Sequence, residues 1–481
     1  MTTFLGPPNE EANMLLPAVI DNRARLEPDR LFCVLINLDK EAGVTTSRCH
    51  AATTPTQSTN VPGGLKRLSK RVLLMSVKIS DEAQLKLLET TECRVLLVAT
   101  NLPAISTSFN RLSLQGNLRI IPFEGVEHWI GQSKVPEYPF LATLESEPNR
   151  PFAILHTSGS TGIPEPIVYT FGALTTYRTW LDPEATISGE QRVTVDRWKN
   201  KVHYVPFPTS HMTGLLIATA LNVYWNMTPI LGSSALFTTP ALVATIHKLD
   251  ICDASILPPS LLEAMAKNPE YLEGLRKLDH VIWCGSAFSS SIISNKISSV
   301  VPIYAAYGTT EAGPLPLVLK DQEYHEYMTF SPLVGAQWPT KDLMSKHPTK
   351  EGMWKYRGRT DDIIVLLNGV NINPLLMEGI LMSHPKVVAA LLTGTGKVKA
   401  AWLIEVVHPP QNEEETTSLV EELWPTVEKA NDATYRTEGK VSKDNIIFTS
   451  KDKPMLRAGK GSVQRKFTLV EFRLELDALY E

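Results

Sequence analysis

Short apolar segments of strand length alternate with helical patterns along most of this chain. Residues 255–258 and 280–284 read as buried strands, and a helical pattern lies between them at residues 260–267. Further elements of this kind are expected as a helix at residues 81–90 and as strands at residues 94–99, 152–156 and 301–305. Neighbouring parallel strands need a long crossover between them, usually a helix. The alternation therefore predicts an α/β protein with largely parallel sheets.

The pattern changes near Gly358. Beyond it we expect strands at residues 363–367, 387–392 and 400–406, and helices at residues 373–383 and 413–431. This compact α+β pattern of about a hundred residues has the normal size of a domain. We therefore expect an N-terminal domain of residues 1–358 and a C-terminal domain of residues 359–481, with the boundary at residues 359–361.

The last segment, residues 468–480, has an amphipathic pattern. Leu469, Phe472, Leu476 and Leu479 fall on one face of a helix. We expect this helix to dock its apolar face on the C-terminal domain.

Composition excludes several classes of protein. Of the 481 residues, 43% are apolar and 20% are charged, which is an ordinary globular mixture. The net charge is −4 and no basic block stands out, so we expect no nucleic-acid partner. Five scattered cysteines fit neither a disulfide framework nor a zinc ribbon, and they indicate reduced thiols. The N-terminus lacks the pattern of a signal peptide, so a cytoplasmic location is expected.

One uncharged stretch, residues 212–246, is long enough to raise the question of a membrane span. Asn222, Asn226, Pro229 and several Ser and Thr residues interrupt it. A span needs about 20 consecutive, mostly apolar residues. We expect a buried helix and a strand here and no membrane span.

A Gly/Ser/Thr loop directly follows the expected strand at residues 152–156. It consists of Thr157, Ser158, Gly159, Ser160, Thr161 and Gly162. Glycines let the backbone approach an anion closely, and hydroxyl and N–H groups can surround phosphate oxygens. No Gly-Lys-Ser/Thr closes the loop, so it is not a Walker motif. Taken alone, such a loop is more often a flexible turn than a phosphate site.

A second motif, from Tyr307 to Glu311 with the letters YGTTE, follows the strand at residues 301–305. A tyrosine ring can stack on a purine, a threonine can bond a phosphate, and a carboxylate can hold Mg²⁺. The alternative is a surface turn, which the presence of two such motifs makes less attractive.

Two more signals lie in the C-terminal part. The segment YRGRTDD, residues 356–362, stands at the expected domain boundary, and RAGKGSVQR, residues 457–465, lies near the end. A lysine between glycines can bring positive charge onto a phosphate on which negative charge develops. By itself, such a segment is usually a solvated basic loop.

In their order, these four motifs resemble the adenylate-forming (AMP-binding) superfamily, which includes acyl-CoA synthetases, luciferases and peptide-synthetase adenylation domains. The resemblance runs from about residue 156 to residue 466. Three phrases are similar to the adenylation domains of fungal synthetase-like carboxylic acid reductases, namely HTSGSTG at 156–162, KHPT at 346–349 followed by WKYRGR at 354–359, and GKGSVQR at 459–465. The resemblance implies a large, multilayered N-terminal domain and a small C-terminal lid.

The resemblance also implies roles for individual residues. The TSGSTG loop binds the β- and γ-phosphates of ATP, Ala306 to Thr309 line the nucleotide, and Tyr307 stacks on adenine. Thr310 contacts the α-phosphate and Glu311 holds Mg²⁺. Asp342 binds the ribose hydroxyls, Arg359 contacts the nucleotide, and Asp361 is the hinge between the domains. Lys460 bridges the carboxylate and the α-phosphate.

The expected reaction is activation of a carboxylic acid by ATP, with release of pyrophosphate. His211, in the segment FPTSHMTG at residues 207–214, occupies the position of the family's substrate gate. A lone histidine is more often structural, and here the two interpretations stand about even. The segment lacks the aspartate of amino-acid-activating domains, so an aryl, keto or fatty acid remains open. Acyl transfer to CoA, or to a phosphopantetheine thiol on a separate carrier protein, would follow.

Three departures from the family pattern favour an alternative. Glu165 stands where the family usually has a lysine, and a carboxylate facing pyrophosphate would repel it. Expected strand–helix–strand units are hard to find between residues 30 and 72, and strands before Asp342 look deleted between residues 333 and 340. The sequence printed ends at Glu481, without a carrier or reductase motif.

The alternative is therefore an impaired nucleotide-binding remnant of a multidomain reductase. A third possibility, a membrane-associated acyl-CoA synthetase, rests only on the uncharged stretch at residues 212–246.

Overall fold

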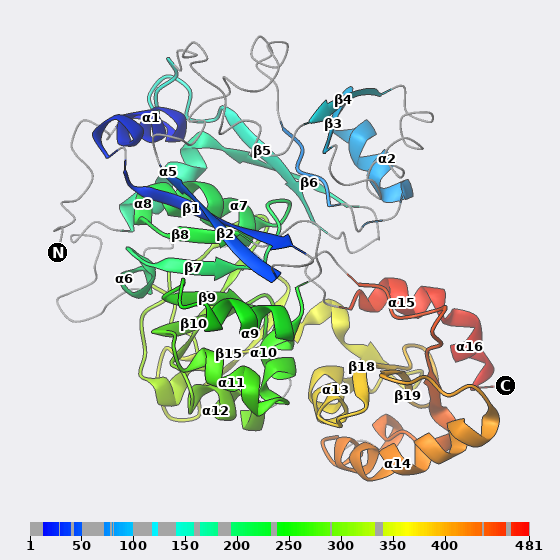
Figure 1. The fold of residues 1–481 in the computed structure, drawn as a ribbon. Helices are drawn as coiled ribbons and strands as arrows, with labels where there is room; N and C mark the ends of the chain where they lie inside the picture. The colour runs from blue at the N-terminus through cyan, green and yellow to red at the C-terminus, as the bar shows by residue number, and fades with distance from the viewer. Residues whose placement is uncertain are drawn as a thin grey trace.

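The structure is a computed structural model in which a large N-terminal domain carries a small C-terminal domain (Figure 1). It describes residues 13–27, 29–39, 43–50, 72–76, 79, 81–99, 118–123, 141–157, 164–180, 194–231, 238–288, 291–331, 340–434, 437–457 and 463–480. The N-terminal part begins with helix α1 (Leu16–Leu26). The prediction of an α/β fold with a large domain and a small lid is confirmed.

A seven-stranded sheet forms the centre of the large domain, in the order β11-β10-β9-β7-β8-β1-β2. All neighbours are parallel except the hairpin of β1 and β2. The strands are β1 (Leu31–Asp39), β2 (Gly43–His50), β7 (Val202–Val205), β8 (Thr228–Leu231), β9 (Ala254–Leu257), β10 (His280–Cys284) and β11 (Ile303–Ala306). The expected strands at residues 255–258, 280–284 and 301–305 are thus found within one or two residues of their predicted bounds.

Both faces of the sheet are covered at β9, β10 and β11, which explains why these strands are mostly apolar without alternation. In β10, Val281 and Trp283 pack into one core and Ile282 and Cys284 into the other, because successive side chains point to opposite faces. The first core contains α9 (Pro240–Lys248), α10 (Pro259–Ala266), α11 (Pro269–Leu275) and α12 (Ser291–Ser298). The second contains α1, α5 (Phe171–Thr179), α6 (Val195–Trp198) and α7 (Met212–Leu216) with the turns that follow it.

Two smaller sheets belong to the large domain. Strands β5 (Pro151–His156) and β6 (Pro166–Thr170) form an antiparallel hairpin, whereas Ile154 of β5 also forms a parallel bridge with Leu73. The expectation of parallel pairing for the strand at residues 152–156 therefore holds for this bridge and not for the hairpin. Strands β3 (Val95–Ala99) and β4 (Arg119–Phe123) are parallel, after α2 (Asp81–Thr90). Strand β3 was expected to be buried, but Leu97 is 38% exposed, and among the described residues β4 alone pairs with β3.

The uncharged stretch folds as expected into buried helix and strand. Helix α7 continues through a π-helical turn, η4 (Ile217–Leu221), into α8 (Asn222–Trp225), and β8 and α9 follow. Within the residues described, no helix combines the length and apolarity that crossing a bilayer requires.

Residues 30–72 and 333–340 were identified from the sequence as shortened regions, and the structure describes strands in the first of them. Between residues 30 and 72, the β1/β2 hairpin supplies two strands that the sequence analysis did not find. Residues 51–71 and 332–339 lie outside the described residues. Strand β14 (Asp342–Lys346) pairs directly with β15 (Trp354–Arg359), so Asp342 stands opposite Arg359.

The small domain is built on a three-stranded sheet, β18 (Val387–Thr393), β19 (Ala401–Val406) and β20 (Ile446–Phe448). Helices α13 (Pro374–Met382) and α14 (Glu413–Asn431) cover one face. The short elements here and at the domain boundary are η6 (Thr360–Asp362), β16 (Ile364–Val365), β17 (Asn371–Ile372), η7 (Thr437–Gly439) and η8 (Lys443–Asn445). One further turn, η5 (Gln322–Tyr324), lies in the large domain, where Gln322 accepts the Ile303 N–H.

The amphipathic C-terminal segment covers the other face of this sheet. It forms α15 (Arg465–Glu471) and α16 (Arg473–Ala478), which meet at Phe472. Phe472 and Leu476 are buried against Leu391 and Leu403, with Leu469 and Leu479 packed beside them. The predicted docking helix is confirmed, although it is broken into two.

Candidate functional site

The β5/β6 hairpin positions the Gly/Ser/Thr loop. The Thr157 N–H donates to the Glu165 carbonyl oxygen at 3.0 Å, directly beyond the last paired residues of the two strands. Thr157 and Glu165 therefore stand at the base of the loop, and Glu165 is exposed. Ser158, Gly159, Ser160, Thr161 and Gly162 lie outside the described residues.

The YGTTE motif leaves β11 after Ala306 and forms a tight hairpin. Strands β12 (Gly308–Thr309) and β13 (Gly313–Pro314) pair across a turn that contains Thr310 and Glu311. The backbones approach so closely that a Cβ on Gly308 would lie 2.5 Å from the Gly313 carbonyl oxygen. The turn leaves Glu311 exposed.

Tyr169 of β6 joins the loop hairpin to the YGTTE turn. Its hydroxyl donates to the Thr310 carbonyl oxygen at 2.7 Å, while its ring is buried. Burial raises the pKa of the Tyr169 hydroxyl, and the negative charge of Glu311 raises it further. Tyr169 therefore remains a protonated donor, and it fixes the backbone at which Thr310 and Glu311 are presented.

Gly313 is expected to be intolerant of a side chain. Its φ is +72°, and a Cβ there would lie 2.2 Å from the buried Tyr177 hydroxyl. Gly352 has a φ of +73°, and no atom of the described residues lies within 4 Å of a Cβ placed there, so Gly352→Ala is the matched control. Both changes incur the cost of positive φ, about 1 kcal/mol. Gly313→Ala should lose about 1–3 kcal/mol more in chemical denaturation because Tyr177 must move, and equal losses would contradict this packing.

Tyr307, Asp342 and Arg359 form one polar cluster. The Tyr307 hydroxyl donates to Asp342 Oδ2, and Arg359 Nη1 lies 3.9 Å from Asp342 Oδ1. Burial, and then the hydrogen bond to Asp342, raise the pKa of Tyr307. The Asp342 side chain is only 7% exposed, whereas that of Arg359 is 44% exposed. Three residues predicted from separate motifs are thus brought together.

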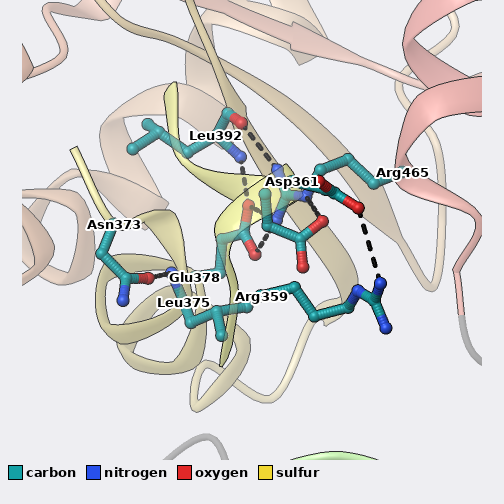
Figure 2. Close-up of polar contacts among 8 residues, drawn as sticks. Arg359, Asp361, Asn373, Leu375, Glu378, Leu392 and Arg465 are labelled. Atoms are coloured by element: carbon teal, nitrogen blue, oxygen red, sulfur yellow. Dashed lines mark hydrogen bonds and ion pairs between the residues drawn. The ribbon is translucent and has the colours of Figure 1, made fainter. Parts of the chain in front are cut away.

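Asp361 lies directly beside this cluster. Its Oδ2 is 3.5 Å from Arg359 Nη2 (Figure 2). The same oxygen is 3.9 Å from Lys341 Nζ. The Thr360 N–H donates to the Lys341 carbonyl oxygen at 2.9 Å. The predicted hinge residue therefore sits in the first turn after β15, where the chain enters the small domain.

Among the described residues, the contacts of His211 are structural. His211 is the N-cap of α7, and its Nδ1 accepts the Thr213 N–H at 3.2 Å. The imidazole stacks on the Phe207 ring, with centroids 5.3 Å apart. The acceptor role of Nδ1 leaves the proton of a neutral ring on Nε2. A contact of His211 with the acyl group or AMP stays a prediction.

Metal chemistry at this site depends on few protein ligands. Among the residues described, no group of three or more His, Cys, Asp or Glu side chains is placed to hold a metal ion. Mg²⁺ in nucleotide sites is commonly bound by one or two carboxylates together with substrate phosphates. The exposed Glu311 carboxylate fits that requirement.

Lys460 lies outside the described residues, but residues on both sides of it make ion pairs or backbone contacts. Arg457 pairs with Glu405 at 2.7 and 3.1 Å, and it forms a backbone bridge with Val463. On the other side, Arg465 pairs with the buried Glu378. Sequence reasoning missed these pairs and Tyr169, because nothing local links residues so far apart; Arg465 was visible only as the last letter of a motif.

Two family models match this chain. The model described as "AMP-binding enzyme" matches residues 67–343, and "AMP-binding enzyme C-terminal domain" matches residues 361–481. The chain belongs to the AMP-binding enzyme family. The predicted resemblance is confirmed.

Curated relatives include fungal reductases. A carboxylic acid reductase of Neurospora crassa is 29% identical, over 87% of this chain and 43% of the relative. The adenylate-forming reductase Nps10 of Heterobasidion annosum is 30% identical, over 68% of this chain and 33% of the relative. The chain therefore spans less than half the length of these relatives.

Solved structures agree on the fold. The A domain of the Segniliparus rugosus carboxylic acid reductase, in complex with AMP and a co-purified carboxylic acid, has a TM-score of 0.67 at 12% identity. The match covers 97% of this chain and 94% of that one. At this identity the likeness shows the adenylate-forming fold alone.

Proposed function

We propose that this AMP-binding enzyme activates a carboxylic acid with ATP as an acyl-adenylate and releases pyrophosphate. A carboxylate oxygen attacks the α-phosphorus, and the bond to the β-phosphate breaks. The observation that carries the proposal is the convergence of three motifs, in which Tyr169 ties the loop hairpin to Thr310, and Tyr307 meets Asp342 and Arg359. Membership of the family supports the same reaction.

The cluster suits a nucleotide. Tyr307 packs edge-on against Phe330, with centroids 5.5 Å apart, and would offer its ring to adenine. A carboxylate has about four lone-pair sites, so Asp342 keeps acceptors for ribose hydroxyls beyond those used by Tyr307. Arg359 is exposed enough to contact the nucleotide. Ala306, Gly308 and Thr309 would line it, and Thr310 would contact the α-phosphate.

The phosphates need positive charge. Mg²⁺ supplies charge neutralisation on the phosphates when bound, and Glu311 would hold it. Thr157 and residues 158–162 would bind the β- and γ-phosphates through backbone N–H and hydroxyl groups. Lys460 would stabilise the charge that develops between the carboxylate and the α-phosphate.

We place the domain boundary at residues 359–361 and the hinge at Asp361. Arg359 is the last residue of β15, which begins in the large domain, whereas Asp362 already contacts Arg465 of the small domain at 3.6 Å. Rotation at such a boundary would replace Lys460 with a surface open to a thiol, either CoA or the phosphopantetheine of a separate carrier protein.

The acid is proposed to be an aryl, keto or fatty acid. The segment at residues 207–214 contains no carboxylate to pair with an α-ammonium group. Among related folds are the anthranilate CoA ligase AuaEII with anthranoyl-AMP and a benzoate CoA ligase of Burkholderia xenovorans LB400.

The test combines ATP, Mg²⁺ and a panel of aryl, keto and aliphatic acids, with pyrophosphate as the readout. Acid-dependent release that Lys460→Ala abolishes supports the proposal. Nucleotide binding without release across the panel supports the second candidate, a catalytically impaired remnant.

Glu165 is the observation that favours the remnant. Its backbone closes the base of the phosphate loop hairpin, and its side chain is exposed there. A carboxylate near pyrophosphate is repulsive, by about 1–4 kcal/mol at 4 Å for unit charges in water or near a protein surface.

Glu165→Lys is therefore expected to raise the rate of pyrophosphate release about tenfold, which corresponds to roughly 1.4 kcal/mol. Glu147→Lys, an equal charge change at an exposed site before β5, is the control and should leave the rate unchanged. An unchanged or slower rate in Glu165→Lys would remove Glu165 as a cause of impairment.

A further inference from the structure

A buried ion pair lies at the centre of the small domain. Arg465 Nη2 donates to Glu378 Oε1 at 2.6 Å and to Oε2 at 2.5 Å (Figure 2). The side chains are 15% and 4% exposed. Burial opposes the charge of the Arg465 guanidinium, but Glu378 and Asp362 outweigh it and raise its pKa. Burial raises the pKa of the Glu378 carboxyl, and the charge of Arg465 and its hydrogen bond oppose that rise.

The pair connects four separate elements. Arg465 begins α15, and Glu378 belongs to α13. Arg465 Nη1 donates to the Leu392 carbonyl oxygen of β18 at 2.9 Å, and the Leu392 N–H donates to Glu378 Oε1 at 2.6 Å. The fourth element is η6, where Asp362 Oδ1 lies 3.6 Å from Arg465 Nε.

These connections reach both sides of residues 458–462. The two ends of this segment are joined, because Val463 forms a backbone bridge with Arg457 and the Gln464 N–H donates to the Leu456 carbonyl oxygen at 2.8 Å. On the hinge side, Asp362 is the next residue after Asp361. Arg465 thus contacts Asp362, the first residue beyond the hinge. It also directly follows Gln464, one of the residues paired across the segment that contains Lys460.

We propose that Glu378 and Arg465 are positioning residues that couple the hinge segment, through Asp362, to the chain flanking Lys460. This inference rests on the proposed function, because it assigns to the pair the placement of the lysine during adenylation. The pair neutralises Arg465, and the longer contact with Asp362 then aligns η6 against α15. The hinge segment and the residues that flank Lys460 are consequently expected to rotate together as one rigid unit.

Catalysis requires Lys460 to be placed accurately relative to the reacting groups. A displacement of about 1 Å in a reacting constellation can lower a rate about 100-fold. Lys460 is nearly a hundred residues from Asp361 in the sequence, so its placement relative to the hinge depends on tertiary contacts. The contacts from Asp362 to Arg465 and from Gln464 to Leu456 form the short route.

A structural role alone would give a different outcome from a positioning role. Glu378→Gln disturbs the buried pair and can unfold the domain, so Asp362→Asn is the informative variant. The Asp362 side chain is 30% exposed, and its contact with Arg465 is long. Asp432→Asn is the matched control, because Asp432 forms an equally long pair with Lys440, at 3.7 Å, in the same domain.

The experiment measures kcat and KM for ATP in pyrophosphate release, and amide hydrogen exchange at residues 455–465, on the full chain. Asp362→Asn is expected to keep its melting temperature, to lower kcat about tenfold with KM for ATP unchanged, and to speed exchange at Gln464. Asp432→Asn should match the wild type. A kcat for Asp362→Asn equal to that of the wild type would overturn the proposal.

Failure of the proposed function gives a separate signal. If the wild type releases no pyrophosphate with any acid, the adenylation proposal fails, and hydrogen exchange alone judges the coupling. Faster exchange at Gln464 in Asp362→Asn, but not in Asp432→Asn, then supports it. Unchanged exchange overturns it.

Discussion

Lowering the pH from 7.5 to 5 is expected to destabilise the large domain by about 6 kcal/mol, because three buried histidines must remain neutral in the folded state. His203, His280 and His247 are each at most 1% exposed. Burial lowers the pKa of His203 to about 3, and that of His280 and His247 to about 4. The rings of His203 and His280 are neighbours, with centroids 5.8 Å apart.

Charged neighbours of these rings act mostly in the same direction. His280 and the Lys201 ammonium lower the pKa of His203, while its hydrogen bond to the Lys201 carbonyl oxygen raises it. Lys201 and Arg197 lower the pKa of His280, and Asp279 raises it. His203 Nε2, His280 Nε2 and His247 Nδ1 have no hydrogen-bond partner among the residues described, so no acceptor is placed there to receive a second proton.

The sign follows from proton binding. An unfolded histidine has a pKa of about 6.5, so below that pH the unfolded chain binds protons that the folded chain does not. Stability is complete above about pH 7 and falls as the pH drops towards the folded values near 4. At pH 5 the loss is about 2 kcal/mol for each ring.

Calorimetry at pH 7.5 and pH 5 measures this loss. His203→Asn, which retains a donor for the Lys201 carbonyl oxygen, should reduce the pH-dependent loss by about a third. His408→Asn at an exposed site should leave it unchanged. An identical pH dependence in the wild type and His203→Asn would contradict the account.

Glu378→Gln is expected to destabilise the small domain by about 3–5 kcal/mol, because it leaves the buried Arg465 charge without its partner. The substituted amide retains an acceptor for the Leu392 N–H, so most of the loss arises from the uncompensated charge. Amide hydrogen exchange at increasing denaturant, read at residues of β18 and β19 such as the buried Trp402, reports on this domain.

Glu422→Gln provides the comparison for this substitution. Glu422 pairs with Lys386 at 2.7 Å on the surface of the same domain, and both side chains are about half exposed. An exposed pair contributes about 0–1 kcal/mol. Similar losses in Glu378→Gln and Glu422→Gln would show that Arg465 does not depend on Glu378.

Much of the fold could be predicted from local pattern. The helix at residues 81–90, the strand at 280–284 and the helix at 413–431 occur with the predicted bounds, because apolar periodicity reports local burial. Motif order indicated that Tyr307, Asp342 and Arg359 share a site, and the structure brings these three together.

The remainder depended on pairing between distant segments. The β5/β6 hairpin, whose strands are joined by a short loop, is antiparallel and departs from the parallel pattern that the sequence predicts, whereas the bridge between Ile154 and Leu73 follows that pattern. Tyr169 and Glu378 lie in segments that read as core, and their hydrogen-bond partners are 141 and 14 residues away, respectively. The ring of His203 lies against that of His280, on another strand. The periodicity of apolar residues along a segment does not identify contact partners that lie far away in the sequence.

Acid-dependent exchange of labelled pyrophosphate into ATP tests the central claim most directly, because it requires reversible formation of an acyl-adenylate and no thiol acceptor. The account predicts exchange with at least one aryl, keto or aliphatic acid, and a decrease of about 100-fold or more in Lys460→Ala. ATP binding without exchange for any acid, or exchange that persists in Lys460→Ala, would contradict it.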